Sequence, residues 1–525
     1  MTTHDAWGLA AATGSMPDWL RFRAASTPER PAVIASDARW TFAELDARAS
    51  LTARRLASLG VGPGDRVATL LHNGTHVTEV VHGIGRLGAV LVPLNVRLSA
   101  AELAWQIEDV RPALLLVDGQ TAPLAAAAEQ SLPALPRVGV AGASPDVIPL
   151  AALPEADVPL RERIDPDELH SIIYTSGTTG RPKGAMLTWG NFWWSAIGSA
   201  LNLGTRPDDR WLACLPLFHV GGLSILTRGV IYGIAAVVHE GFDPAAVNRA
   251  IDEDGVTIVS VVSTMLRRML AERGARPYPP TFRCALLGGG PAPRPLLEVA
   301  TAHGVPVVQT YGLTETTSQL ATLAPDDALR KLGSAGKPLF PNEIRVARGR
   351  VDAGPGEAGE IIVRGPVVTA GYADRPAETA TALGDGWLRT GDLGYLDADG
   401  YLYVLDRRDD LIVSGGENVY PAEVEAALLA HPDVEEAGVI GVLDPEWGQA
   451  VVAVVRPGGG AALDAAVLQA FCRERLAGYK VPRHVQFTAE PLPRNAGGKL
   501  VRRALRDRWK ADLPGDGTGG GARFA

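Results

Sequence analysis

The sequence has few cysteines and no long apolar run. Its 525 residues include three cysteines, Cys214, Cys284 and Cys472, which are far apart and match no metal-ligand spacing. Three cysteines cannot all pair, so reduced thiols and a cytoplasmic location are expected. No apolar run reaches the ~18 residues of a membrane helix, and the first residues do not resemble a signal peptide. We therefore expect neither a targeting segment nor stable insertion in a membrane.

Basic residues are also fewer than acidic residues. Lys and Arg number 50 against 59 Asp and Glu, which gives a formal net charge of −9 at pH 7. No overall positive field attracts nucleic acid or an anionic membrane, so no nucleic-acid partner is expected. An anionic ligand must instead be held by local cations and backbone N–H groups. The apolar content of 46% is that of a globular protein, and the length predicts two or more domains.

Apolar runs and amphipathic stretches alternate through the first part of the chain. The run "DRVATLL" (65–71) is followed by "THVTEVVHGIGRLG" (75–88) and then by "AVLVPL" (89–94). This order predicts strand, helix and strand of a largely parallel α/β sheet. After about Gly333 the pattern changes, because "NEIRVA" (342–347) and "GEIIVRGP" (359–366) alternate apolar and polar residues. Antiparallel strands are predicted there.

A charge-dense segment, "DRRDD" (406–410), precedes a compact α+β pattern. A helix is expected from Pro421, followed by the strands "EAGVIGVL" (436–443) and "QAVVAVVRP" (449–457). We predict a large domain over 1–408 and a small C-terminal domain over 409–512. The Gly-rich tail, 513–525, is expected to be disordered.

One loop has a composition that no hydrophobic core can use. "YTSGTTGRPKG" (174–184) combines hydroxyl side chains, glycines and Lys183 between a predicted strand and a helix for which Asn191 is the N-cap candidate. Glycines allow close backbone approach, consecutive N–H groups can bind an anion, and the lysine adds a point charge. Phosphate is the ligand class that fits, although the Walker A pattern is absent. A polar surface linker is the alternative reading of the loop alone.

Other segments occur with this loop in a recognisable order. They are "QTYGLTETTSQ" (309–319), "GWLRTGDLG" (386–394), "LDRRDDLIVSGGENVYPAEVE" (405–425) and "LPRNAGGKLVRR" (492–503). Together with the loop, they resemble the motifs of the adenylate-forming acyl-CoA synthetase superfamily, and the resemblance extends from Pro17 to Arg506. It implies a large N-terminal domain of parallel-rich αβα sheets with a small distorted barrel, and a small mobile α+β C-terminal domain.

The resemblance implies an ATP site. Lys183 and the loop hydroxyls would hold the β- and γ-phosphates, and Tyr311 would cover the adenine. Asp392 would accept hydrogen bonds from the ribose, although such an aspartate is equally typical of a turn. The residues implied in ATP binding are Thr175, Ser176, Gly177, Thr178, Thr179, Gly180, Lys183, Gly289, Gly290, Tyr311, Asp392 and Arg407.

The resemblance also implies catalytic residues. Glu315 would bind Mg²⁺, which prefers oxygen ligands, and Thr314 would donate to the α-phosphate. Lys499 would lie between the substrate carboxylate and the α-phosphate. Its motif departs from the usual pattern, because Asn495 replaces a threonine. Asp409 would be the hinge about which the small domain rotates.

Substrate and CoA sites follow from the same resemblance. His219, which the resemblance also places among the catalytic residues, and Gly221 would border the acyl pocket, and Gly288 would allow a flat ring to approach. A packed core histidine is the alternative role of His219. Ser263 and Arg283 are candidate donors to a second carboxylate, with a helix cap as the alternative role of Ser263. The predicted CoA residues are Ser414, Gly415, Gly416 and Trp447.

Two longer segments indicate which carboxylic acid is the substrate. "WLACLPLFHVGGLS" (211–224) and "CALLGGGPAPRPLLE" (284–298) resemble the branch of the superfamily that ligates 2-succinylbenzoate, an aromatic diacid, to CoA in menaquinone biosynthesis. Another aromatic or medium-chain acid is the alternative within the class. A non-catalytic nucleotide-binding protein is the alternative outside it. The expected partners are a small carboxylic acid, ATP and CoA, and a homodimer stays open.

Overall fold

The protein is described from a computed structural model. It covers residues 14–130, 135–142, 147–175, 182–289, 294–349, 351–406, 411–419, 421–458, 463–493, 500 and 502–512. The chain divides into two compact units, the first of which ends at Asp406. The predicted boundary at 408/409 falls outside the described residues and stays a prediction.

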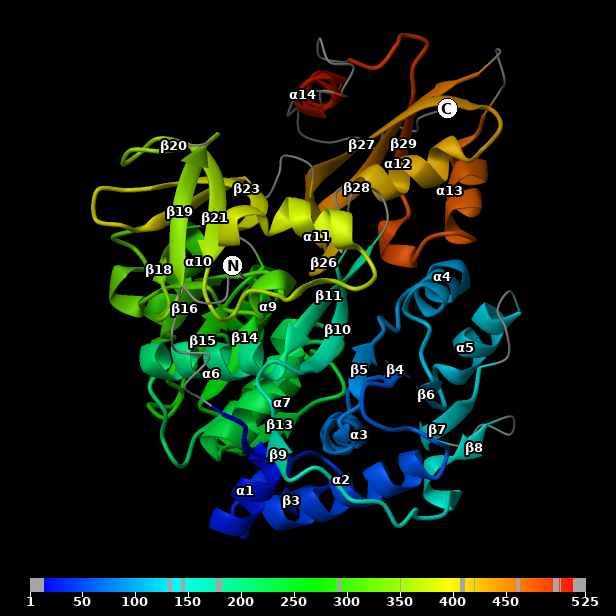
Figure 1. Ribbon diagram of the computed structural model, residues 1–525. Coiled ribbons are helices and arrows are strands. Elements are labelled where there is room, and N and C mark those ends of the chain that lie inside the picture. Colours follow the sequence, from blue (N-terminus) through cyan, green and yellow to red (C-terminus); the bar gives the residue numbers. More distant parts are fainter. Residues whose placement is uncertain are drawn as a thin grey trace. The chain divides into compact units, whose positions relative to one another are not determined.

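The first sheet of the larger unit is mostly parallel (Figure 1). Strands β10, β5, β4, β6, β7 and β8 run parallel, while β11 and β22 add antiparallel partners at one edge. In spatial order the strands are β22 (Gly371–Tyr372), β11 (Lys183–Thr188), β10 (Leu169–Thr175), β5 (Val90–Pro93), β4 (Arg66–Leu70), β6 (Leu114–Asp118), β7 (Arg137–Ala141) and β8 (Ile148–Pro149).

The second sheet has a parallel part and an antiparallel part. The parallel strands are β16 (Val307–Tyr311), β15 (Cys284–Leu287), β14 (Ile258–Val261), β12 (Arg210–Ala213), β13 (Ala235–Val238) and β2 (Pro31–Ile34), with β3 (Arg39–Thr41) antiparallel at the edge. The antiparallel strands are β17 (Ala321–Leu323), β18 (Ser334–Pro338), β24 (Leu402–Asp406), β23 (Leu388–Leu396), β21 (Gly359–Arg364), β19 (Glu343–Arg348) and β20 (Val351–Asp352). The predicted change of pattern near Gly333 is confirmed.

Helices connect the strands and fill the space between the sheets. In the larger unit they are α1 (Trp19–Ser26), α2 (Phe42–Ala57), α3 (Thr75–Arg86), α4 (Ala100–Val110), α5 (Ala122–Glu129), α6 (Trp189–Leu203), α7 (Val220–Tyr232), α8 (Pro244–Asp252), α9 (Ser263–Arg273), α10 (Arg294–Ala302) and α11 (Pro376–Ala382). A short pair, β1 (Met16–Pro17) and β9 (Arg163–Ile164), lies apart from both sheets.

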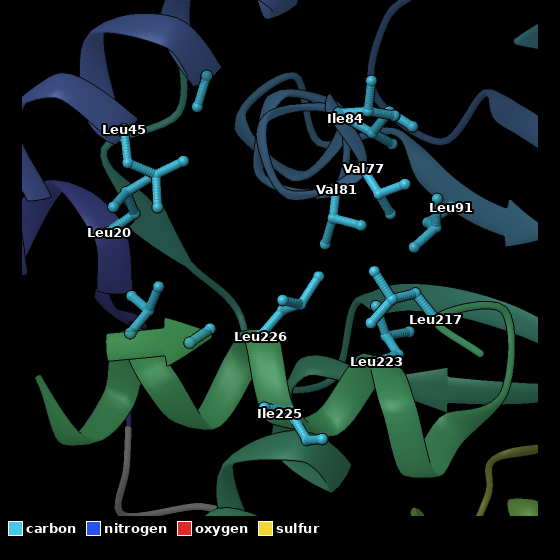
Figure 2. Packing of buried hydrophobic residues seen from close by; sticks show 14 of the residues in the cluster. Leu20, Leu45, Val77, Val81, Ile84, Leu91, Leu217, Leu223, Ile225 and Leu226 are labelled. Atoms are coloured by element: carbon cyan, nitrogen blue, oxygen red, sulfur yellow. The ribbon is translucent and has the colours of Figure 1, made fainter. Parts of the chain in front are cut away.

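The largest hydrophobic cluster joins the helices of the two sheets. Val77, Val81 and Ile84 recur at helical spacing on α3 and are buried. Figure 2 shows Val81 of α3 pointing toward Leu226 of α7 within one continuous cluster. Because α3 follows a strand of the first sheet and α7 a strand of the second, this core holds the two sheets together. The predicted α/β fold with parallel-rich sheets is confirmed.

The N-cap predicted for α6 is displaced by one turn. Thr188, not Asn191, is the N-cap, and its side chain accepts from the Asn191 N–H. The Asn191 side chain accepts from the Thr188 N–H at 2.8 Å and donates to the carbonyls of Pro366 and Val368 at 2.9 Å. Asn191 therefore completes a capping box and ties α6 to a distant loop.

The smaller unit is an α+β domain. Its strands are β25 (Ile412–Ser414), β26 (Glu417–Val419), β27 (Val434–Asp444), β28 (Gly448–Pro457) and β29 (His484–Phe487), in one mixed sheet. Its helices are α12 (Pro421–Leu429), α13 (Ala465–Arg473) and α14 (Arg502–Asp512). The helix predicted from Pro421 and the two strands after it are present.

Candidate functional site

Most predicted site residues of the larger unit lie at one edge of the second sheet. Strands β16, β15, β14 and β12 are parallel neighbours, so their carboxyl ends share that edge. The segments that follow these strands, including the first residues of α7 and α9, carry Thr314 and Glu315, Gly288 and Gly289, Ser263, and His219 with Gly221. In open α/β sheets, ligands bind beyond the carboxyl ends of the strands. Residues up to about a hundred positions apart are thus brought to one edge.

Glu315 lies in a single 3-10 turn, η3 (Thr314–Thr316), just after β16. Its Oε1 atom accepts hydrogen bonds from Thr175 Oγ1 at 3.3 Å and from the Tyr372 hydroxyl at 3.0 Å. Among the described residues, no hydrogen bond or ion pair reaches the other oxygen, Oε2. A carboxylate with one oxygen held and one left over fits a monodentate Mg²⁺ ligand, since Mg²⁺ is usually held by one or two carboxylates together with substrate phosphates.

Lys183 begins β11, across the hairpin from Thr175 at the end of β10. Its ammonium group lies 5.2 Å from the centroid of the Tyr372 ring. No ion pair joins Lys183 to Glu315 within the described part of the chain. The ammonium group and the carboxylate both contact Tyr372, and neither is neutralised by the other.

Tyr311 and Asp392 form a second pair. The Tyr311 hydroxyl donates to Asp392 Oδ2 at 2.7 Å, and both residues are buried. The Asp392 N–H in turn donates to Thr390 Oγ1 at 3.0 Å. These bonds join the end of β16 to β23. They would therefore hold together Tyr311, predicted to cover the adenine, and Asp392, predicted to accept hydrogen bonds from the ribose.

The loop that carries His219 is held by a buried asparagine from the other sheet. Asn73 follows β4, and its Oδ1 accepts from the Leu217 N–H at 2.9 Å. Its Nδ2 donates to the carbonyl of Leu215 at 2.9 Å and to that of His239 at 3.3 Å. The Phe218 and His219 rings meet edge to face at 4.6 Å between centroids. Asn73 was not predicted, because a lone asparagine after a strand is typical of any turn.

A buried polar cluster lies between α6 and α7, and the sequence did not predict it. Arg228 is 2% exposed and donates to Ser195 Oγ, which donates to the carbonyl of Thr317 just beyond η3. Within the described residues no carboxylate is paired with Arg228, and its Nε atom has no hydrogen-bond partner. The same part of the chain provides no hydrogen-bond partner for the buried oxygens of Ser224 (Oγ) and Gln319 (Oε1). Buried polar groups of this kind are commonly satisfied by ordered water.

Arg283 does not have the predicted role. Its guanidinium donates to both carboxylate oxygens of Asp209, at 2.7 and 2.6 Å, and to the carbonyls of Leu203 and Gly204 that end α6. Arg283 also precedes β15, at the end of the strand opposite the site. The candidate donor to a second carboxylate is therefore a structural residue. Ser263 is not a helix cap either, because Val262 is the N-cap of α9.

Replacing Arg283 by methionine should destabilise the fold without changing acid selectivity. The substitution leaves the Asp209 carboxylate buried without its cation, which typically costs about 3–5 kcal/mol. Burial would raise the pKa of Asp209, but hydrogen bonds from Arg283, Thr257 and the Arg206 N–H outweigh it and hold that pKa below its ordinary value. The stabilisation is therefore present above about pH 3.9 and is lost as the pH falls through the folded-state pKa.

Denaturant unfolding of Arg283→Met and of the wild type at pH 7 and at low pH measures this effect. The difference between the two proteins should shrink as Asp209 becomes protonated. If Arg283→Met had unchanged stability but an altered preference among acids, the structural role of Arg283 would be contradicted. Its predicted role as a donor to the second substrate carboxylate would then be supported.

In the smaller unit, three predicted CoA residues, Ser414, Gly415 and Gly416, lie at the β25–β26 turn, and the fourth, Trp447, directly precedes β28. Gly415 and Gly416 have φ values of +59° and +84°, which favour glycine. The Gly415 N–H donates to the carbonyl of Trp447 at 2.8 Å, and a Cβ on Gly415 would lie 2.8 Å from the Trp447 ring. The Arg483 guanidinium lies 4.1 Å from the centroid of the same ring. The turn and Trp447 are thus packed together, and their role in CoA binding stays a prediction.

Nine predicted site residues lie outside the described residues. They are Ser176, Gly177, Thr178, Thr179, Gly180, Gly290, Arg407, Asp409 and Lys499. Their roles stay predictions. Among the described residues there is no cluster of three or more His, Cys, Asp and Glu side chains that could hold a metal ion, and no helix both long and apolar enough to cross a membrane.

Comparison with known families decides the class. Residues 20–373 match the AMP-binding enzyme family, and residues 423–499 match the C-terminal domain of AMP-binding enzymes. The chain belongs to the AMP-binding enzyme family. Both matches agree with the α/β architecture and with the positions of the motifs.

Relatives within this family are similar over almost their whole length. A 2-succinylbenzoate–CoA ligase of Geobacillus kaustophilus is 56% identical over 492 residues, which are 94% of this chain and 98% of the relative. A 2-succinylbenzoate–CoA ligase of Bacillus cereus is 47% identical over 496 residues, with 94% and 98% covered.

Solved structures extend the similarity to the fold. The o-succinylbenzoate CoA synthetase of Bacillus subtilis, as a double mutant bound with its product analogue OSB-NCoA, has a TM-score of 0.88 at 45% identity and covers 94% of this chain and 99% of its own. The same Bacillus subtilis enzyme in complex with ATP and magnesium ion has a TM-score of 0.72 at 45% identity, with 94% and 100% covered.

Proposed function

We propose that this chain is an ATP-dependent 2-succinylbenzoate–CoA ligase of menaquinone biosynthesis. The observation that carries the proposal is the 56% identity to a ligase of that specificity over 94% of the chain and 98% of the relative. The gathering of Thr175, Lys183, Glu315, Tyr311 and Asp392 at described positions of the larger unit supports the adenylating half of the reaction. ATP, Mg²⁺ and CoA are the implied co-substrates and cofactor.

The reaction has two halves. In the first, an oxygen of the substrate carboxylate attacks the α-phosphorus of ATP, the bond to pyrophosphate breaks, and acyl-AMP forms. In the second, the CoA sulfur attacks the acyl carbonyl, the bond to AMP breaks, and the thiol proton passes to solvent. Mg²⁺, when bound, would supply positive charge that offsets the charge of the phosphates. Glu315 is the residue that would hold the ion, and Lys183 would add a cation to the phosphates.

Arg228 supports a diacid as the substrate. One carboxylate of 2-succinylbenzoate is activated, and the other is carried through the reaction unchanged. A charge buried in a protein is normally paired, because an unpaired one costs several kcal/mol or more. Arg228 has no carboxylate partner among the described residues, and its buried Nε atom has no hydrogen-bond partner there. A second substrate carboxylate, reached directly or through a water, would complete this cluster.

An acid panel tests the proposal. Purified protein with MgATP and CoA should release AMP and pyrophosphate fastest with 2-succinylbenzoate, and much more slowly with benzoate, octanoate or palmitate. Arg228→Met should lower kcat/KM for 2-succinylbenzoate by about 10-fold or more, the value of a charge-assisted hydrogen bond, and should change the rate with benzoate far less. Preference for a monoacid would agree with the enzyme class but contradict 2-succinylbenzoate as the substrate. Release of ADP would overturn the class.

Two further points accompany the proposal. A cytoplasmic location stays a prediction, and assembly as a homodimer stays open. Size-exclusion chromatography with light scattering measures the second directly.

A further inference from the structure

Tyr372 contacts both the Glu315 carboxylate and the Lys183 ammonium group, the two charged groups expected to bind MgATP. Its hydroxyl donates to Glu315 Oε1 at 3.0 Å, and its ring lies 5.2 Å from the Lys183 ammonium group. It belongs to none of the segments that identified the site in the sequence. It lies 57 residues from Glu315, on the two-residue strand β22 at the edge of the first sheet.

The segment that carries Tyr372 is firmly fixed. The Ala370 and Ala373 N–H groups donate to the carbonyls of Met186 and Gly184 on β11 at 3.0 and 2.8 Å. The Tyr372 N–H donates to Thr379 Oγ1 at 2.9 Å. The Thr369 N–H donates to the backbone carbonyl of Glu315 at 2.8 Å, so the same segment also holds the turn η3.

Ion pairs fix the other end of the segment. Asp374 accepts from Arg66 at 3.0 Å and from Arg111 at 2.9 Å, and Arg375 pairs with Asp109 of α4. Asp109 also accepts from the Tyr174 hydroxyl at 2.7 Å, and Tyr174 directly precedes Thr175. The strand that ends in Thr175 and the segment that carries Tyr372 are thus tied to the same aspartate.

The two donors to Glu315 determine how its carboxylate points. Thr175 and Tyr372 both donate to Oε1, and the described residues provide no donor to Oε2. Both donors are neutral, so the negative charge of the carboxylate is kept. Carboxylate ligands of metals are commonly held by hydrogen bonds of this kind, and their loss typically lowers metal affinity about 10- to 100-fold.

We propose that Tyr372 is a positioning residue for the nucleotide-bound Mg²⁺: its hydroxyl holds Glu315 so that Oε2 faces the metal, while its ring holds the Lys183 ammonium group beside the phosphates. This inference rests on the proposed function, because it assumes that Glu315 binds the Mg²⁺ of MgATP. The hydroxyl would act on the metal through Glu315, and the ring would act on Lys183. Substitutions that remove the hydroxyl alone or the whole ring can therefore test the two roles separately.

Nucleotide binding with and without the metal tests the assignment. In Tyr372→Phe, the dissociation constant for MgATP, measured by calorimetry, should rise about 10-fold. The dissociation constant for AMP in EDTA should stay within about 2-fold, because AMP lacks the metal-bridged phosphates. In Tyr372→Leu, which also removes the ring, MgATP binding should weaken by a further ~2- to 5-fold, the value of an exposed cation–π contact. Tyr395→Phe, in a tyrosine of β23 that stacks on Tyr403, is the matched control and should change neither constant.

Other outcomes would overturn the inference. Equal weakening of MgATP and AMP would show a merely structural role for the tyrosine, and no change in either would show that the hydroxyl does not act on the metal. If Tyr372→Phe does not fold, Thr175→Val, which removes the other donor to Oε1, should show the same split between MgATP and AMP. If the wild type itself forms no acyl-AMP from MgATP and any acid, the proposed function fails, and this outcome is distinct from an unchanged variant of an active enzyme.

Discussion

Replacing Lys499 by alanine should lower the rate of acyl-adenylate formation at least ~100-fold, the effect of removing one group that stabilises developing charge. The reason is electrostatic. A carboxylate must approach a phosphate, and two like charges 4 Å apart repel by about 4 kcal/mol at an effective dielectric constant of 20. A lysine between them relieves this repulsion and stabilises the transition state.

The same variant should largely keep the second half of the reaction. CoA attacks a neutral acyl carbonyl, so the cation is not required to bring two anions together. Pyrophosphate release measures the first half, and thioester formation from supplied acyl-AMP measures the second. Lys510→Ala, in the same basic C-terminal run, is the control and should retain both activities. Equal losses in the two half-reactions would contradict this division of roles.

Replacing Glu315 by glutamine should lower kcat/KM for MgATP by ~100-fold or more. The amide oxygen of glutamine can still accept from Thr175 and Tyr372, so the local structure should survive. The negative charge that would attract Mg²⁺ is lost, and with it the stabilisation that the metal would give the phosphates. Pyrophosphate release at varied MgATP concentration measures kcat/KM. Denaturant unfolding of the same variant shows whether a lower activity comes from the lost charge or from a destabilised fold.

A surface carboxylate provides the control for Glu315→Gln. Glu343 is partly exposed and pairs with Arg364 at 2.8 Å, and such pairs contribute ~0–1 kcal/mol. Glu343→Gln should therefore leave the MgATP kinetics unchanged. If Glu315→Gln weakens AMP binding in EDTA as strongly as it weakens MgATP binding, Glu315 acts on the nucleotide and not on the metal.

The predictions that rested on contiguous segments agree best with the structure. The strand, helix and strand of 65–94 are β4, α3 and β5, and the change to antiparallel strands occurs near Gly333. Periodicity carries this information because a helix or strand buries one face, and the apolar residues of that face recur at a regular spacing. The helix cap was displaced from Asn191 to Thr188 because either polar residue can begin a helix, and the competing bonds of Asn191 to a distant loop are invisible in the sequence.

Pairings between distant residues were the part that sequence reasoning missed. Arg283 was expected at the substrate and instead pairs with Asp209, 74 residues earlier. Asn73 bonds to Leu217 at a separation of 144 residues, and Arg228 to Ser195 at 33. Which partner a polar side chain finds depends on which elements the core brings together, and no local pattern encodes that choice.

The sequence by itself determined the α/β class and the order of the elements, and it predicted the motif residues of a nucleotide site, because each depends on residues that are neighbours along the chain. Only the tertiary structure decided that Tyr372 holds Glu315, that Asn73 holds the loop before His219 and that Arg228 is buried with no carboxylate partner in the described part of the chain. The first two contacts form beyond the carboxyl ends of parallel strands, whereas Arg228 lies between the helices α6 and α7. All three depend on how the helices pack between the two sheets.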